Sequence, residues 1–397
     1  MNMLLGALDI GTQTTSLVAG EFDGETLTVV ARTETETNGV RKGFIRDINA
    51  VAAGIRKVRD DMDRRFRIDL ADVSAAISCF GLTAAVRSGQ TLLMPGHAID
   101  QDNVDAAEEN AQSVEADDST DLVLQRFRQK YEVNGQPVGT PLGMTGSELV
   151  ANILEISVPR TALDALTSAV HHAGLRLMDT AFSGYAASEA VLDAKARNDG
   201  ALVLDFGAGT VDYIAICNNV VAAAGNLAVG GSHLTNDIAL AFQISQAQAE
   251  EVKLARGAAQ IQSDLAKDRY ALRTTFATSE RSLSVHAIQT IVTERIDETF
   301  RILAERLRDV LPHIRGAIYL TGGTAALPLI TEQASAIFGL PCVLGIPCNV
   351  AKLPPDMMDE PYRHATAVGL LNSRCRTLAQ EDRRPSLLSR FRAFLRG

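Results

Sequence analysis

The chain has 397 residues, of which 46% are apolar, and a formal net charge of −10 at pH 7. This length allows two or three domains with a large core, and the acidic balance argues against general binding of nucleic acid. No apolar stretch approaches the roughly 20 residues of a spanning helix, and we expect no signal peptide. The five cysteines lack the paired spacing of a metal site, which indicates reduced thiols in a cytoplasmic protein.

The N-terminal part begins with an apolar run at 4–8, a turn with Asp9, Gly11, Thr12 and Gln13, and a second apolar run at 17–20. This order predicts a β-hairpin. The small turn residues would let backbone N–H groups approach an oxyanion. We expect further strands at 27–33 and 73–78, and a helix over 48–66 in which apolar residues recur at helical spacing.

Residues 82–160 differ in character from the first part. We expect short strands at 84–87 and 91–94, an acidic helix that begins at Asp100 or Asp102, and a strand at 150–158. Helices are then predicted over 159–173 and 181–194. Residues 194–199 are charged, and their last two residues form Asn-Asp-Gly with Gly200, which is typical of a junction between lobes.

The strongest pattern lies at 199–217, where two apolar runs flank a second small-residue turn. That turn reads Asp205-Phe206-Gly207-Ala208-Gly209-Thr210, and a third turn, Gly322-Gly323-Thr324, follows the apolar run 317–320. Backbone N–H groups of such turns bind anions, and a carboxylate at a strand end can hold Mg²⁺ through water. A tight hairpin without a ligand explains one such turn equally well. Three turns, two of them led by an aspartate, favour phosphate binding.

Between the second and third turns we expect three helices. The first follows Gly230 and Gly231, with Ser232 as its N-cap, and a helix N-terminus of this kind favours phosphate. The second carries Glu250 and Lys253, for which a solvated helix face is the alternative. The third is a long helical stretch over 281–311, and a closing helix is expected at 364–371.

The end of the chain is basic, because residues 383–397 carry five arginines and no acidic residue. Polar residues 374–384 predict a linker. The apolar stripe that follows consists of Leu387, Leu388, Phe391, Phe394 and Leu395, flanked by Arg390 and Arg392. This stripe is too short to span a bilayer, so it predicts a helix that lies in the interface of an anionic membrane. A helix docked on the protein itself is the alternative.

The three turns resemble those of the actin, chaperone and sugar-kinase nucleotide-binding fold. Further motifs resemble the FtsA family of bacterial cell-division proteins: G-V-x-K-G-x-I-x-D at 39–47, P-x-G-M-x-G at 141–146, A-E-x-V-K-x-x-x-G at 249–257 and T-A-V-G-L-L at 366–371. The resemblance runs along nearly the whole chain. It implies an α/β, actin-like, two-lobed nucleotide-binding fold with a small α/β subdomain inserted in the first lobe.

The resemblance also implies domain boundaries. The first lobe comprises 1–82 and 161–197, the inserted subdomain 83–160, and the second lobe 198–230 and 312–373. Residues 231–311 form an adenosine-side and partner-binding subdomain, 374–384 a linker, and 385–397 an amphipathic membrane-targeting helix. In the family the inserted subdomain mediates contacts between neighbours in a filament; a surface insertion without a partner is the alternative.

The resemblance places ATP and Mg²⁺ in a cleft between the lobes. Gly11, Thr12 and Gln13 would contact the phosphates from one side and Gly207, Ala208, Gly209 and Thr210 from the other, while Asp9 and Asp205 orient the hydrated Mg²⁺. Gly322, Gly323 and Thr324 would line the nucleoside, with Gly230, Gly231, Glu250 and Lys253 beside it. The family has three consecutive glycines where this chain has Ala208, so a positive φ there would strain the loop. No residue stands out as a strong base, and we expect slow hydrolysis or binding only.

The implied function is that of a cell-division protein that polymerises on the inner face of the cytoplasmic membrane at the division site. It would tether the tubulin homologue FtsZ and help to recruit the divisome. The acidic and apolar FtsZ C-terminal tail is the expected partner, with Arg281 and Arg295 as candidate contacts; solvated arginines are the alternative. A PilM-type assembly protein with a different partner also remains open. A small-molecule kinase is disfavoured, since no catalytic carboxylate or substrate pocket can be identified.

Overall fold

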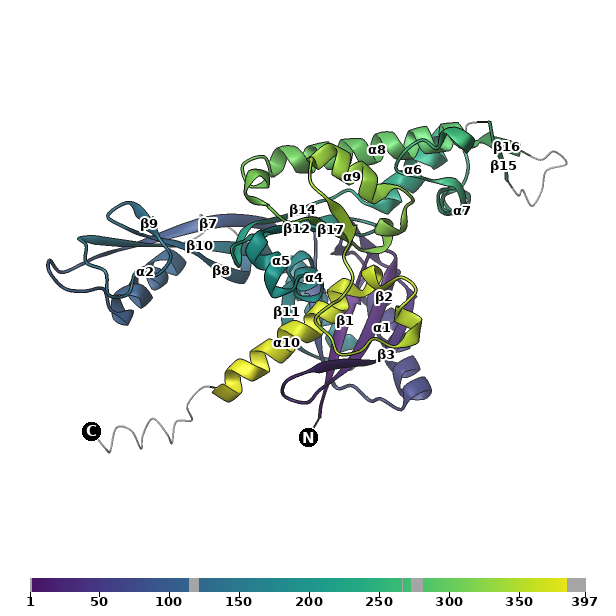
Figure 1. Cartoon of the computed structure of the whole chain (residues 1–397). Helices are drawn as coiled ribbons and strands as arrows, with labels where there is room; N and C mark the ends of the chain where they lie inside the picture. Colours follow the sequence, from purple (N-terminus) through teal and green to yellow (C-terminus); the bar gives the residue numbers. More distant parts are fainter. Residues whose placement is uncertain (1, 114–120, 266, 273–280, 384–397) are drawn as a thin grey trace.

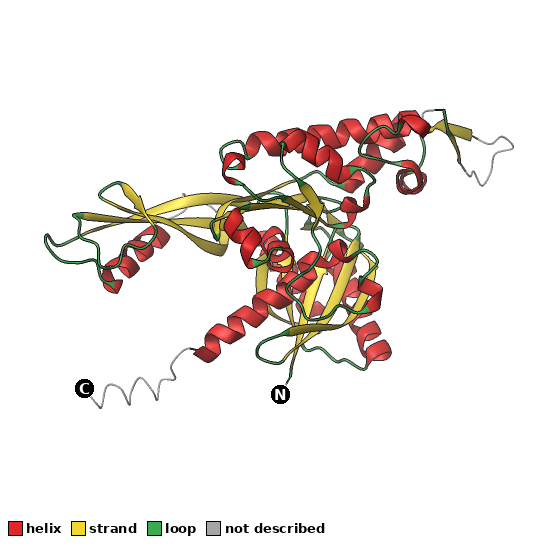
Figure 2. Cartoon of the chain, viewed as in Figure 1, coloured by secondary structure: helices red, strands yellow, loops and turns green. Residues whose placement is uncertain are grey.

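Two five-stranded sheets and one four-stranded sheet organise the chain (Figure 1). The structure, a computed structural model, describes residues 2–113, 121–265, 267–272 and 281–383. Figure 2 shows helices packed around the two larger sheets, whereas the four-stranded sheet projects away from them with one helix beside it. The two larger sheets define two lobes.

The first lobe is built on a sheet with the order β11-β6-β1-β2-β3. Its strands are β1 (Met3–Ile10), β2 (Thr14–Phe22), β3 (Leu27–Glu36), β6 (Asp72–Ile77) and β11 (Arg176–Phe182). Strands β1, β2 and β3 are antiparallel neighbours, and β6 runs parallel to both β1 and β11. Helices α1 (Ile48–Phe66) and α3 (Arg160–His172) pack against each other, and a small ribbon of β4 (Val40–Arg41) and β5 (Phe44–Ile45) precedes α1.

Helix α1 has the bounds that its apolar spacing predicted. Asp47 caps its N-terminus, where the carboxylate accepts a hydrogen bond from the Ala50 N–H at 3.0 Å. The chain leaves the helix at Arg67, in the left-handed conformation. One face of the helix is buried, through Val51, Ala52, Ile55, Val58 and Met62. Local signals were therefore sufficient to predict this element.

The four-stranded sheet is antiparallel and has the order β7-β10-β8-β9. It comprises β7 (Thr83–Leu92), β8 (Asp121–Val133), β9 (Gln136–Val138) and β10 (Glu148–Pro159), with helix α2 (Gln101–Ser113) packed on it. The two short strands expected at 84–87 and 91–94 are one strand, because β7 pairs with β10 without a break from Thr83 to Leu92. This sheet occupies the range expected for the inserted subdomain; the domain boundaries themselves stay a prediction.

The second lobe is built on a sheet with the order β14-β13-β12-β17-β18. Its strands are β12 (Ala201–Phe206), β13 (Val211–Cys217), β14 (Val220–Leu227), β17 (Ile318–Thr321) and β18 (Cys342–Leu344). The helices are α6 (Gly231–Phe242), α7 (Gln246–Arg256), α8 (Val285–Arg306) and α9 (Ile330–Phe338). Five single 3₁₀ turns complete the structure: η1 (Ser263–Leu265), η2 (Leu311–His313), η3 (Gly323–Ala326), η4 (Pro355–Met357) and η5 (Pro361–His364).

The helix expected over 281–311 is shorter than predicted at both ends. Its first residues form β16 (Arg281–Ser284), which pairs with β15 (Arg269–Leu272). Ser284 then caps α8, and its hydroxyl accepts a hydrogen bond from the Ala287 N–H at 3.3 Å. Pairing with the preceding strand β15 thus overrides the helical pattern of the first four residues.

Three helices connect the lobes: α4 (Ser183–Val191), α5 (Ala194–Asp199) and α10 (Ala365–Arg383). The single helix expected over 181–194 ends earlier, because Leu192 is extended and the Asp193 carboxylate caps α5. The linker expected over 374–384 is also wrong, because α10 continues through this range and ends at Arg383. No glycine or proline interrupts residues 370–384, and Arg374 holds the helix to Asp179 through an ion pair of 3.1 Å.

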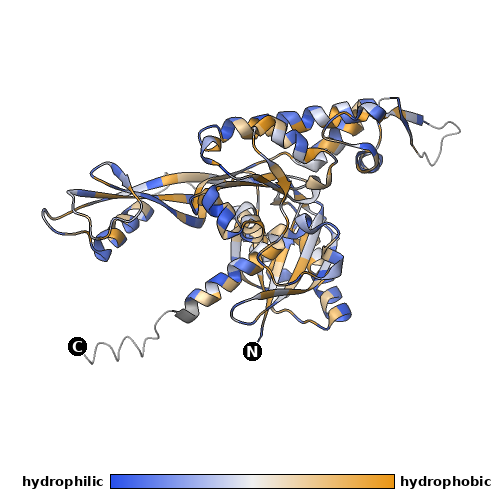
Figure 3. Cartoon of the chain, in the orientation of Figure 1, coloured by the Kyte–Doolittle hydropathy of each residue, from blue (hydrophilic) through white to orange (hydrophobic). Residues whose placement is uncertain are grey.

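Buried apolar side chains form three cores. The first fills the first lobe and includes α4 and α10, the second fills the second lobe, and a small third core lies between α2 and its sheet. Figure 3 shows the apolar residues gathered in the strands of both lobes, with polar residues on the outer faces of the helices. The first core also contains Val203 and Ile214 of the second sheet, so the two lobes share buried surface at α4.

Helices α4 and α10 touch backbone to backbone at Gly369. A Cβ atom at this position would lie 1.6 Å from the Ala186 carbonyl oxygen, so only glycine allows the two helices to pack this closely. We expect Gly369→Ala to lower the free energy of unfolding by about 1–3 kcal/mol or more, because one helix must move off the other. Denaturant unfolding measures this. Gly139→Ala, where a Cβ meets nothing within 4 Å, is the matched control; equal stability of the two variants would contradict the expectation.

Candidate functional site

The first two glycine turns face each other across the gap between the lobes. Each turn is closed by one backbone hydrogen bond of 2.9 Å. The Gly11 N–H donates to the Thr14 carbonyl, and the Gly207 N–H donates to the Thr210 carbonyl. A Cβ on Gly209 would lie 2.2 Å from Thr12 Oγ1, so the turns are in contact. Both predicted hairpins are confirmed, in the register Asp9–Ser16 for β1 and β2 and Asp205–Asp212 for β12 and β13.

A cavity of about 150 Å³ lies between the two turns. Its lining contains the residues predicted to contact phosphate or Mg²⁺ from the first two turns: Asp9, Gly11, Thr12, Gln13, Asp205, Gly207, Ala208, Gly209 and Thr210. Gly322 and Gly323, which were predicted to line the nucleoside, line this cavity as well. Asp9 and Gly323, the first and last of these residues, are more than 300 residues apart in the sequence, so only the folded chain brings them together.

Three aspartates line this cavity: Asp9, Asp205 and Asp212. Burial, followed by the nearby Asp205 charge, raises the pKa of Asp9 to about 7. Burial also raises the pKa of Asp205, against a hydrogen bond from the Thr366 hydroxyl at 2.7 Å. The pKa of Asp212 lies well above its usual range because of burial and then of Asp205. Such a cluster lowers its energy by taking up protons or a cation.

A second cavity, of about 620 Å³, continues the first toward α6 and α7. The two cavities share lining residues, so they form one cleft with a narrow and a wide part. The shared residues are Gln13, Thr14, Glu34, Ala208, Gly323 and Arg363, and the wide part adds the predicted residues Gly231, Glu250, Lys253 and Thr324. Gly230 lines neither part: it is the N-cap of α6, and a Cβ on it would lie 2.6 Å from the Ala208 backbone.

Lys253 holds α7 against the start of α6. Its ammonium donates to the Glu250 carboxylate at 2.7 Å, the Thr235 hydroxyl at 3.0 Å and the Gly231 carbonyl at 3.2 Å. The side chain is buried, which overturns the solvated helix face considered as an alternative. Burial works to raise the pKa of Glu250, but the hydrogen bonds from Lys253 and Thr235 outweigh it and lower the pKa.

One expectation about the backbone of the cleft is wrong. Ser232 is not the N-cap of α6 but lies in its first turn, after Gly230. The Gly231 and Ser232 N–H groups already donate to the Gly207 and Ala208 carbonyls, at 3.0 and 2.8 Å. In addition, Ala208 is not among the described residues with positive φ, so its side chain causes no backbone strain.

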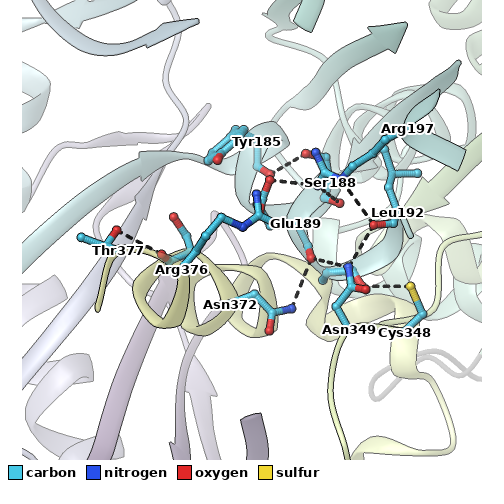
Figure 4. Close-up of polar contacts among 12 residues, drawn as sticks. Tyr185, Ser188, Glu189, Leu192, Arg197, Cys348, Asn349, Asn372, Arg376 and Thr377 are labelled. Carbon is cyan, nitrogen blue, oxygen red and sulfur yellow. Dashed lines mark hydrogen bonds and ion pairs between the residues drawn. The ribbon is translucent and has the colours of Figure 1, made fainter. Parts of the chain in front are cut away.

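A buried carboxylate, Glu189 of α4, lies where the chain crosses between the lobes (Figure 4). Its oxygens pair with Arg197 of α5 at 2.8 Å and with Arg376 of α10 at 2.6 Å. Its backbone carbonyl accepts from the amides of Asn349 and Asn372, at 2.9 and 3.2 Å. The same helix begins at Ser183, which lines the narrow part of the cleft. The cluster therefore ties all three connecting helices to one residue next to the site.

The sequence analysis missed several residues of the narrow cavity. Asp212 is the clearest, because it lies directly opposite Asp205 in the hairpin and is hydrogen-bonded by the Ser78 hydroxyl at 2.6 Å. Six residues separate Asp205 from Asp212, and they contain the four-residue turn. This spacing would have predicted that the two aspartates lie opposite each other. Like charges in that position destabilise a hairpin, so the pair indicates a functional role. Thr366 and Arg363 come from the opposite end of the chain. Thr366 begins the T-A-V-G-L-L motif, but no local signal places either residue in the cleft.

The candidate partner residues both contact this chain. Arg281 donates to the Phe242 carbonyl at the end of α6. Arg295 pairs with Asp237 at 2.7 Å and also with Glu298. Their contact with a partner stays a prediction. The membrane residues Leu387, Leu388, Arg390, Phe391, Arg392, Phe394 and Leu395 lie outside the described residues.

Sequence comparison identifies relatives that cover nearly the whole chain. The family model described as "Cell division protein FtsA" matches residues 202–369. FtsA of Pseudomonas aeruginosa is 28% identical over 93% of this chain and 88% of its own length. FtsA of Neisseria meningitidis is 26% identical over 94% of this chain and 90% of its own. The chain is therefore similar to the cell-division protein FtsA over more than 90% of its length. FtsA of Escherichia coli K12, at 26% identity over 93% of this chain, agrees with this relationship.

Solved structures show the same fold at lower identity. The PilM-PilN type IV pilus biogenesis complex superposes with a TM-score of 0.67 at 18% identity, over 94% of this chain and 98% of the other. MreB5 of Spiroplasma citri bound to ADP gives a TM-score of 0.58 at 14% identity, over 96% and 98%. The actin-like, two-lobed α/β fold expected from the sequence is thus confirmed.

Proposed function

We propose that this protein, like the FtsA proteins that it resembles, binds ATP in the cleft between its lobes and uses it to control polymerisation on the inner face of the cytoplasmic membrane. The observation that carries the proposal is the continuous cleft, narrow between the two glycine turns and wide beside Glu250 and Lys253. The narrow part suits phosphates held by backbone N–H groups, and the wide part suits the nucleoside. The ADP in the MreB5 structure supports a nucleotide as the ligand of this fold.

The residues of the narrow cavity also fit a Mg²⁺ ion. Asp9, Asp205 and Asp212 supply the negative charge that a divalent cation would neutralise. Within the described ranges, no three His, Cys, Asp or Glu side chains are arranged to ligate a metal ion directly. We therefore propose that the carboxylates orient a hydrated Mg²⁺ that neutralises the phosphates. This chain's own residues position the nucleotide, and any hydrolysis is slow.

The polymer would connect the membrane to cell-division partners. We propose that residues 385–397 bind an anionic membrane surface as an amphipathic helix, and that the second lobe binds the acidic C-terminal tail of FtsZ. One short helix binds weakly, but many helices on one polymer bind strongly. No helix in the described part of the chain is both long and apolar enough to cross a membrane.

Co-sedimentation with anionic liposomes tests the membrane part of the proposal. The full chain is expected to pellet with lipid, more strongly with ATP, because polymerisation multiplies the attachments. A variant truncated after Arg384 is expected to stay in the supernatant. Equal pelleting of the two would contradict the assignment of the tail. If both stay in the supernatant, the tail is not a membrane anchor, and an assembly protein without a membrane role is favoured.

A PilM-type assembly role is the second candidate, because the PilM-PilN complex has the same fold at a TM-score of 0.67. The two candidates differ in partner. Binding of a peptide with the sequence of the FtsZ C-terminal tail, measured by fluorescence anisotropy, would support the first. A charge-reversed Arg281→Glu variant tests whether that part of the second lobe takes part, with Arg308→Glu on exposed surface as the control.

A further inference from the structure

We propose that Arg363 binds the phosphates of the nucleotide and thereby sets the preference of the cleft for ATP and ADP over adenosine. This inference rests on the proposed nucleotide function. It starts from the charges of the narrow cavity. Among the described residues that line it, four are aspartate or glutamate, namely Asp9, Glu34, Asp205 and Asp212, and Arg363 is the single arginine or lysine.

Arg363 lies where the two parts of the cleft join, since it lines both of them. A nucleotide whose phosphates occupy the narrow part and whose nucleoside occupies the wide part must pass this point. A guanidinium there can donate two parallel hydrogen bonds to phosphate oxygens. Lys253 and Lys57 line only the wide part, and Lys253 is already engaged with Glu250, Thr235 and Gly231.

The backbone on both sides of Arg363 is fixed to the nucleotide turns. The carbonyl of Tyr362 accepts a hydrogen bond from the Gly322 N–H at 3.2 Å. The hydroxyl of Thr366 donates to Asp205 at 2.7 Å. Tyr362 and His364 are buried, whereas Arg363 between them is exposed. The side chain is therefore presented at the cleft by a rigid segment.

Glu360 holds the guanidinium without a nucleotide. Its carboxylate accepts from Arg363 Nη1 at 2.7 Å, and both side chains are about 40% exposed, at 42% and 41%. An exposed pair of this kind is weak. The guanidinium can therefore leave Glu360 for a phosphate group without a large loss, and Glu360 also lines the wide part of the cleft.

The test compares the binding of ATP, ADP and adenosine to full-length variants by isothermal titration calorimetry. Arg363→Gln is expected to weaken ATP and ADP binding by about 10- to 100-fold, the usual effect of losing a charge-assisted hydrogen bond. Adenosine binding should stay within about twofold, which also shows that the variant is folded. Arg363→Lys should recover part of the loss. Glu360→Gln, which frees the guanidinium, should bind ATP at least as tightly as the unchanged protein.

The control is Arg308→Gln, because Arg308 forms the same (i, i+3) pair with Glu305 on exposed surface, at 3.0 Å. Its ATP affinity should not change. If Arg363→Gln binds ATP as the unchanged protein does, the inference is wrong while the proposed nucleotide function stands. An equal loss for adenosine and ATP would also overturn it, because a phosphate contact cannot act on adenosine. If the unchanged protein binds none of the three ligands, both the role of Arg363 and the proposed nucleotide function are wrong.

Discussion

Replacing Glu189 with alanine is expected to lower the free energy of unfolding by roughly 3–5 kcal/mol. The carboxylate is fully buried and faces two guanidinium groups, those of Arg197 and Arg376 (Figure 4). Its removal leaves both charges without a partner and opens a cavity between α4, α5 and α10. Because these helices connect the lobes, the variant should also lose the fixed arrangement of the cleft. Chemical denaturation, followed by circular dichroism, measures the change.

The two arginines allow a sharper version of this experiment. The Arg197 side chain is 15% exposed and that of Arg376 is 51% exposed, so Arg197→Ala should destabilise the protein more than Arg376→Ala. Glu305→Ala removes an exposed pair and should change the stability by less than about 0.5 kcal/mol. If Glu189→Ala is no more destabilising than Glu305→Ala, the cluster does not hold the connecting helices together.

The elements that the sequence predicted well are those with local signals. Helix α1 carries its own cap at Asp47 and its own apolar stripe, and each glycine hairpin has both strands within a short stretch. The errors lie where contacts with other segments decide. Strand β16 forms because it pairs with the preceding strand β15, and α10 extends to Arg383 with the help of ion pairs to the distant residues Asp179 and Glu189. Neither partner is visible in the local pattern.

The same distinction applies to the cleft. Gly11, Gly207 and Gly322 were found because each lies in a turn with a recognisable order of residues. Arg363 and Thr366 belong to the site only because Tyr362 and Thr366 bond to Gly322 and Asp205. Backbone strain at Ala208 would require a positive φ angle, and the amino-acid sequence alone does not give that angle.

Replacing Asp9 with asparagine is expected to stabilise the protein without ligand and to weaken Mg²⁺-dependent ATP binding strongly. Burial and the Asp205 charge raise the pKa of Asp9 from 3.8 to about 7. A carboxylate whose pKa is raised by folding binds more protons in the folded than in the unfolded state. Its ionisation therefore makes the folded protein less stable as the pH rises from about 4 to about 7. Asparagine cannot ionise, so the variant should melt at a higher temperature than the unchanged protein at pH 8, and at a similar temperature at pH 4.

Binding should show the opposite dependence on pH. Mg²⁺ competes with the proton on Asp9, so the affinity of the unchanged protein for Mg²⁺ and ATP should rise by up to about tenfold per pH unit below pH 7 and then level off. ATP itself also titrates near pH 6, and Asp205 and Asp212 have raised pKa values too. Asp9→Asn corrects for both, because its weaker binding retains the dependence that comes from the ligand and from these two aspartates. Calorimetry at pH 6, 7 and 8 gives both curves. If the two curves are parallel, Asp9 takes up no proton in this pH range. Its carboxylate is then ionised in the folded protein even without a bound cation, and the prediction is wrong.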